Sequence, residues 1–129
     1  MAKYKIIPCS GIGKVFGLLA REAAYAAAGP DAEVVCLGHV VKGDEAGAAL
    51  VAGCPCITID GCNGMCAAKS VRARGGKVKA NYCSLITVRQ HRGMAPGTAA
   101  DLTEDGWQLA DALAADIRAK IAELEGGGE

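Results

Sequence analysis

The sequence is poor in aromatic side chains, with one Trp, three Tyr and one Phe among 129 residues. Ala, Val, Ile and Leu must therefore fill most of the hydrophobic core. The charge is balanced, with 14 basic and 14 acidic side chains. This balance argues against the broad basic surface that binds nucleic acid or an anionic membrane. No apolar run approaches the roughly 20 residues that span a bilayer. We expect no nucleic-acid partner and no membrane partner.

The N-terminal residues lack the apolar stretch of a secretory signal, because Pro8 follows only a few apolar positions. We therefore expect a cytoplasmic protein, in which reduced cysteines serve as metal ligands or reactive thiols. Hydrophobic residues make up 51% of the chain, which is enough to form a core. No linker or repeat divides the chain. We predict one domain over residues 1–125 and a flexible tail over 126–129.

Short apolar runs alternate with helical patterns along the chain. Four runs predict strands, at residues 5–8, 33–37, 56–60 and 82–88. Three segments predict helices, at residues 14–28, 44–52 and 63–74. A last helix is expected to begin at Thr103 and to include Trp107 in its apolar stripe. Such alternation indicates an α/β fold: a small doubly wound, mostly parallel four-stranded sheet, order 2-1-3-4, with helices on both faces.

Seven cysteines are an odd number, so disulfides cannot pair all of them. In an open α/β sheet, sites form at the carboxyl ends of the strands, near the point where the strand order reverses. Cys9 and Cys62 each follow a predicted strand closely, and Cys36 lies near the end of another. Cys66 follows Cys62 by four residues, which places both on one helix face. Four thiolates are the ligand set of a closed tetrahedral zinc site.

The residues alone leave two interpretations of these four cysteines open. They form one shared metal site, or they are small buried hydrophobic side chains scattered through the core. An iron–sulfur cluster would use the same four thiolates as zinc. The other three cysteines fall at the starts of predicted strands, so we expect them at the opposite edge of the sheet or in the core: Cys54, Cys56 and Cys83.

A thiol-based redox or sulfur-transfer enzyme is the main alternative of another class. Cys9, predicted to precede a helix, would be the nucleophile in such an enzyme, and Cys36 or Cys62 would be the resolving thiol. His39 and His91 fall on predicted loops and are expected to be solvated side chains. No feature of the sequence establishes an enzymatic turnover.

Two further features near the predicted strand ends have structural interpretations. Glycines at 11, 13 and 17 approach a dinucleotide fingerprint, but the strand 33–37 lacks the acidic residue that binds a ribose hydroxyl. We therefore expect these glycines to allow a tight turn and close helix packing. Asp60, at the end of the strand 56–60, is expected to cap the following helix.

Three stretches of the chain resemble the DGC-domain family, whose members are regarded as zinc-binding proteins: Pro8-Cys-Ser-Gly-Ile-Gly13, Cys36-Leu37 and Asp60-Gly-Cys62 with Cys66-Ala-Ala-Lys69. The resemblance covers nearly the whole chain. It implies one metal ion bound by four cysteines, which map onto Cys9, Cys36, Cys62 and Cys66. It implies no settled activity and no known protein partner. The segment Arg89–Arg92 departs from the family pattern.

Overall fold

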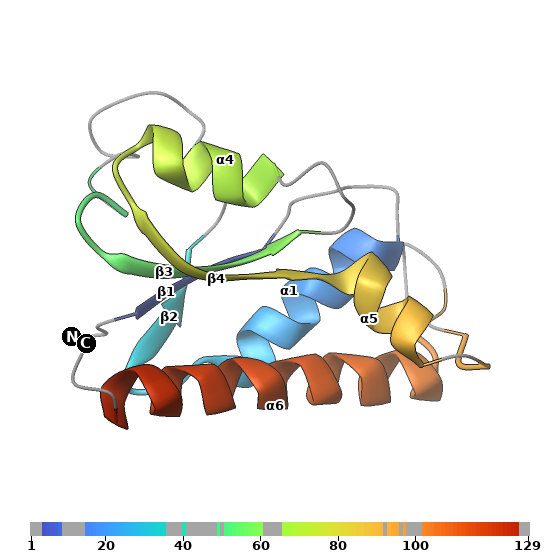
Figure 1. Ribbon diagram of the computed structural model, residues 1–129. Coiled ribbons are helices and arrows are strands. Elements are labelled where there is room, and N and C mark those ends of the chain that lie inside the picture. Colours follow the sequence, from blue (N-terminus) through green and yellow to red (C-terminus); the bar gives the residue numbers. More distant parts are fainter. Residues whose placement is uncertain are drawn as a thin grey trace.

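The computed structural model describes residues 4–8, 15–35, 40, 49, 51–60, 66–91, 93–95, 97 and 102–126. Its strands and helices alternate along the chain, and they are labelled as in Figure 1. The elements are β1 (Tyr4–Pro8), α1 (Val15–Ala27), β2 (Ala32–Val34), β3 (Pro55–Asp60), α4 (Cys66–Ala73), β4 (Lys77–Cys83), α5 (Ser84–Gln90) and α6 (Glu104–Gly126).

The four strands form one parallel sheet in the order β2-β1-β3-β4. The chain adds β2 on one side of β1 and then returns to the other side, where β3 and β4 follow. The order therefore reverses beside β1. In Figure 1, α4 lies on one face of the sheet, and α1 and α6 lie on the other. The predicted doubly wound α/β fold and its strand order are confirmed.

The alternation of side chains along the strands produces two separate hydrophobic cores. Ile57 and Ile59 of β3 point into the larger core, which includes Leu113 of α6. Ile7 of β1 and Cys56 of β3 point into the smaller core beneath α4. Alanines on the buried side of α1 let this helix approach both the sheet and α6 closely: Ala20, Ala23, Ala24 and Ala27.

The helix ends carry the signals that the sequence suggested. Thr103 caps α6, because its Oγ1 accepts a hydrogen bond from the Gly106 amide at 3.1 Å. α4 ends at Ala73, and Gly75 follows in the left-handed region with φ of +85°. The Gly76 amide then donates to the Val71 carbonyl at 2.9 Å, which closes the turn into β4.

The predicted strand at residues 82–88 is wrong. The strand runs instead from Lys77 to Cys83, and residues 84–90 form the helix α5. The β-branched residues Ile86, Thr87 and Val88 had favoured the strand. However, the short turn after α4 places Lys77 beside Pro55, and the chain then pairs with β3 as far as Cys83.

Two smaller expectations also need correction or fall outside the structure. Trp107, predicted in the apolar stripe of the last helix, is 47% exposed. Most of the predicted helix 44–52 lies outside the described residues; Ala49 is helical, whereas Val51 belongs to a turn. Among the described helices, none combines the length and the apolar character needed to cross a bilayer.

Candidate functional site

The carboxyl ends of the parallel strands lie together at one edge of the sheet (Figure 1). We call this the carboxyl edge, and its strand ends are Pro8, Val34, Asp60 and Cys83. β1 and β3 are direct neighbours, with Pro8 paired to Ile59. In open α/β sheets, this edge beside the reversal of strand order is where ligand sites form.

Three of the four predicted metal ligands lie outside the described residues: Cys9, Cys36 and Cys62. The fourth, Cys66, is the first residue of α4. The described chain reaches the carboxyl edge just before two of these positions. Pro8 immediately precedes Cys9 at the end of β1. The Val35 amide, one residue before Cys36, donates to the Ile6 carbonyl at 2.9 Å.

A buried carboxylate ties α4 to the end of β3. Asp60 is 1% exposed, and its Oδ1 accepts a hydrogen bond from the Ala67 amide at 2.7 Å. Ala67 is the second residue of α4, and its N–H would otherwise lack an intrahelical acceptor. The expectation that Asp60 caps this helix is therefore confirmed. The bond fixes the start of α4, and with it the Cys66 backbone, at the carboxyl edge.

Asn81 completes the surroundings of this carboxylate. Its Nδ2 donates to Asp60 Oδ2 at 2.9 Å and to Thr58 Oγ1 at 2.6 Å. Thr58 and Asp60 are both buried, so these bonds satisfy polar atoms that water does not reach. Asn81 was not among the predicted site residues, because it lies one residue before the strand predicted at 82–88. The only sequence feature that could have indicated its role was a polar side chain just before that predicted strand.

Cys83 lies at the carboxyl edge, whereas the sequence predicted it at the opposite edge or in the core. It is the last residue of β4, and the β3–β4 register pairs it with Asp60. Its side chain is partly buried. The correction follows directly from the shift of β4, because a residue that begins a strand and one that ends it lie at opposite edges of a parallel sheet.

Cys54 and Cys56 lie at the amino end of β3, as expected. Cys56 is fully buried, and its thiol donates to the Cys54 carbonyl at 3.3 Å. Burial raises the pKa of Cys56 to about 11, and the proximity of Cys54 adds to this effect. A thiol with so high a pKa is a poor nucleophile and a poor metal ligand at neutral pH. These observations support a packing role for Cys56.

The structure describes one of the two histidines. His39 lies outside the described residues. His91 is exposed just after α5, as expected for a solvated side chain, and its Nδ1 is 2.8 Å from the Thr87 carbonyl. Within the described part of the chain, no three His, Cys, Asp or Glu side chains come together to hold a metal ion.

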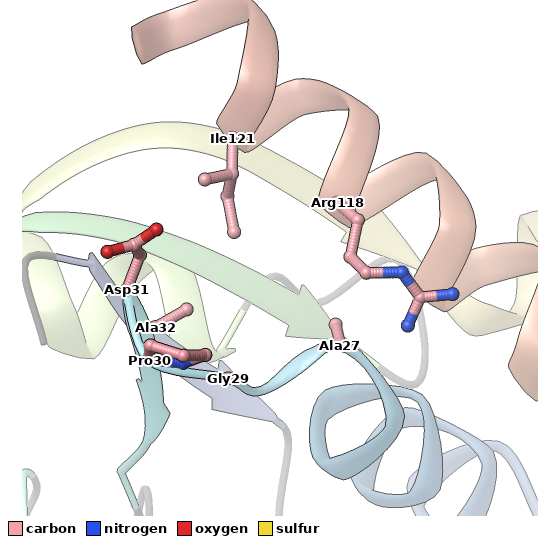
Figure 2. Close-up of a pocket in the computed structure, with 7 residues that line it drawn as sticks. All are labelled: Ala27, Gly29, Pro30, Asp31, Ala32, Arg118 and Ile121. Carbon is pink, nitrogen blue, oxygen red and sulfur yellow. The ribbon is translucent and has the colours of Figure 1, made fainter.

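A shallow cavity of about 140 Å³ lies beside the amino end of β2, away from the carboxyl edge. Figure 2 shows the side chains of Asp31 and Ile121 on its two sides, while the Arg118 guanidinium turns toward α1. Arg118 Nη1 donates to the Ala26 carbonyl at 2.6 Å, so this guanidinium joins α6 to α1. The remaining lining residues are small and have no polar side-chain atoms: Ala27, Gly29, Pro30 and Ala32.

The fold is that of a small doubly wound α/β domain, in which Asp60 and Cys83 lie at the carboxyl ends of their strands. The family model of the DGC domain matches residues 5–107. The chain therefore belongs to the DGC domain family. Comparisons with curated proteins and with solved structures gave no match.

Proposed function

We propose that the protein binds one zinc ion through Cys9, Cys36, Cys62 and Cys66 at the carboxyl edge, and that it handles or senses metal or sulfur. Four cysteine thiolates are the donor set that closed tetrahedral zinc sites use. Such a site has no open coordination position, so it suits storage, transfer or sensing better than hydrolysis. The membership of the DGC domain family adds support to this choice of residues.

The observation that carries this proposal is the attachment of α4 to the end of β3. Asp60 Oδ1 holds the Ala67 amide at 2.7 Å, which keeps Cys66 beside the last residue of β3. Cys62 lies two residues after Asp60 in the chain. Two residues of chain span at most roughly 7 Å, so we propose that the Cys62 thiol binds the same ion as Cys66.

The neighbouring strand supplies the next thiol. Cys9 is one peptide bond from Pro8, whose strand runs directly beside β3. Adjacent strands are roughly 4.8 Å apart. Two sulfurs bound to one tetrahedral zinc lie about 3.8 Å apart, because each zinc–sulfur bond is about 2.3 Å long, and cysteine side chains from neighbouring strand ends are long enough to make up the difference.

Cys36 is the fourth member of the proposed set. It follows Val35, whose amide is hydrogen-bonded to β1 at 2.9 Å. β1 lies between β2 and β3, so the ends of these three strands form a row at the carboxyl edge. One ion above the end of β1 would be flanked on both sides by chain segments that carry cysteine.

The test is the metal content of the purified protein together with its colour. We expect about one zinc per chain and no visible absorption, because zinc thiolates are colourless. An iron–sulfur cluster on the same thiolates would absorb visible light. Elemental analysis that finds iron and sulfide in place of zinc would replace the zinc assignment, and metal-free protein in which the four proposed ligand thiols all react freely would end the proposal.

The ligand set is tested by Cys62→Ser, with Cys54→Ser as its matched control at the amino edge. Cys62→Ser should lower the zinc content and the melting temperature, because structural metal binding contributes folding free energy. Cys54→Ser should keep about one zinc per chain. Unchanged zinc content in Cys62→Ser would remove Cys62 from the set.

A further inference from the structure

We propose that the outer edge of β4 binds an extended acidic segment of a partner protein, which pairs with β4 as an additional strand of the sheet. This inference is independent of the proposed metal site. It rests on two features of the described residues. One is a long, exposed strand at the edge of the sheet, and the other is a concentration of positive charge on and beside that strand.

The balanced charge of the whole chain conceals a separation of charge along the sequence. Residues 61–100, which we call the basic segment, contain seven Lys or Arg residues and no Asp or Glu. All 14 acidic residues lie in the other parts of the chain. The elements α4, β4 and α5 all belong to the basic segment, so the positive charge is gathered in one part of the fold.

β4 presents two of these cations at an edge of the sheet. It is the last strand in the order β2-β1-β3-β4, so among the described strands it has a neighbour on one side only. Lys77, Lys79 and Asn81 are all exposed. The outer side of β4 is therefore accessible along these positions. The other edge of the sheet is formed by β2, which has only three residues and offers much less backbone for pairing.

The positive charge at this edge is not neutralised within the described part of the chain. Lys69 and Arg72 are exposed on α4, which contacts β4, and they add to the charge of Lys77 and Lys79. The described carboxylates form no ion pair with any of these four side chains. By contrast, Lys5 of β1 is paired with a carboxylate of β2. A partner that brings negative charge to the edge of β4 would therefore meet cations that have no other counterion among the described residues.

The same features determine the charge of the partner. Lysines and β-bulges are the devices by which natural edge strands avoid pairing with neutral segments and with further copies of themselves. In β4 the bulge is confined to Lys79, the extra residue between two positions that pair with β3. A second copy of β4 would bring its own lysines and no carboxylate to this edge. An acidic segment would instead place carboxylates beside the lysines, which stabilises cross-strand pairs.

The backbone of the edge favours a polypeptide over a nucleic acid. An edge strand offers N–H and C=O groups at the spacing of another extended peptide, and strand addition of this kind is a recurring mode of peptide recognition. Sites for single-stranded nucleic acid combine positive charge with exposed aromatic side chains on which bases stack. The one aromatic residue of β4, Tyr82, is partly buried and packs against the larger core. The edge therefore lacks a stacking surface on this strand.

The first test measures binding of a fluorescent peptide of alternating Val and Glu residues to the full chain, by fluorescence anisotropy at low salt. The same peptide with Gln in place of Glu should bind at least roughly tenfold more weakly, because it lacks the charge that the lysines attract. Lys77→Glu/Lys79→Glu should weaken binding of the Val-Glu peptide by at least roughly tenfold for the same reason.

The matched control is Arg21→Glu/Lys120→Glu, which makes the same change in net charge on α1 and α6. It should change the affinity by less than about twofold, since charges farther away than a Debye length are screened. An equal loss of affinity in both double variants would overturn the inference, because net charge alone would then explain the binding. Absence of binding of the Val-Glu peptide to the wild-type protein would overturn it as well.

The second test distinguishes strand addition from simple attraction between opposite charges. Two versions of the Val-Glu peptide carry N-methyl groups, one on the Val amides and the other on the Glu amides. A strand that pairs with β4 directs the amides of alternate residues toward it. One version should therefore lose at least roughly tenfold in affinity, while the other binds like the unmodified peptide. Equal affinities of the two versions would refute strand addition.

A short single-stranded oligonucleotide completes the experiment as a competitor of the Val-Glu peptide. We expect it to displace the peptide only at a concentration at least roughly tenfold above that of unlabelled peptide, because it cannot pair with the strand backbone. Displacement at an equal or lower concentration would overturn the inference and identify the basic surface as a nucleic-acid site.

Discussion

The buried carboxylate of Asp60 offers the sharpest test of how the carboxyl edge is held together. Replacing Asp60 with Ala removes the acceptor for the Ala67 amide at 2.7 Å and the acceptor for Asn81 Nδ2 at 2.9 Å. Ala67 is fully buried, so water could not replace Asp60 as the acceptor for its N–H. The loss of a buried bond to a carboxylate and of a second, partly exposed one adds to about 3 kcal/mol.

That free energy is readily measurable. For a two-state domain of 129 residues, 1 kcal/mol corresponds to about 4 °C in melting temperature, so Asp60→Ala should lower it by about 12 °C. Thermal unfolding followed by circular dichroism, with metal removed by a chelator, gives the value without a contribution from bound zinc. Asp111→Ala, an exposed carboxylate on α6, is the matched control and should change the free energy of unfolding by less than about 0.5 kcal/mol.

Asp60→Asn distinguishes hydrogen-bond geometry from charge. The new amide keeps an oxygen for Ala67, and the exposed Asn81 amide turns so that its oxygen accepts from the new NH₂ group. We expect a cost of about 1 kcal/mol, since both hydrogen bonds are then neutral. This account of how α4 is anchored would be refuted if Asp60→Ala had the melting temperature of the wild type. It would also be refuted if Asp60→Asn were as unstable as Asp60→Ala.

Two further predictions concern the smaller core beneath α4. At Gly76, a Cβ atom would lie 2.4 Å from Val71 Cγ1 and 3.3 Å from Cys56 Sγ. Gly76→Ala should therefore lower the free energy of unfolding by about 1–3 kcal/mol, measured by urea unfolding. In the double variant Gly76→Ala/Val71→Ala the clash is relieved, so the two changes should cost less together than the sum of their separate effects. Gly29→Ala is the control, because nothing lies within 4 Å of a Cβ atom there. Cys56, with its pKa raised by burial from 9.0 to about 11, should be roughly a thousandth thiolate at pH 8 and should resist alkylation in the folded protein. The folded state holds this proton more tightly than the unfolded chain. The stability that the pKa shift contributes is therefore complete below pH 9 and is lost as the pH rises to 11. The melting temperatures of the wild type and Cys56→Ala should converge over that range. Equal alkylation rates for Cys56 in folded and urea-unfolded protein would contradict the second prediction.

The topology of the sheet could be predicted because two sequence features indicate each of the first three strands. One is an apolar run, and the other is the glycine or helical pattern that follows it. Ile57 and Ile59 belong to the larger core and Cys56 to the smaller one, as a strand covered on both faces requires. Asp60 could be assigned to capping for a local reason as well, since an acidic residue at a strand end precedes a helical pattern.

The last strand and the exposed aromatic residues could not be predicted from local patterns. The run from Lys77 to Cys83 contains Lys, Ala and Asn, which are depleted in strands, yet it pairs along the whole length of β3. Its conformation is determined by that neighbour. Trp107 was predicted in an apolar stripe, but it is 47% exposed, and Tyr25 is 60% exposed, whereas the buried positions of α1 are occupied largely by alanines.

The shift of β4 changes more than a boundary, because it reverses the assignment of a cysteine. A strand of seven residues is roughly 20 Å long, so starting it at Cys83 or ending it there moves the thiol from one edge of the sheet to the other. The reversal also decides which cysteine is a suitable control for the proposed metal site. From the sequence, Cys83→Ser is a change remote from the proposed centre, whereas the pairing of Cys83 with Asp60 places it at the carboxyl edge and leaves Cys54→Ser as the remote change.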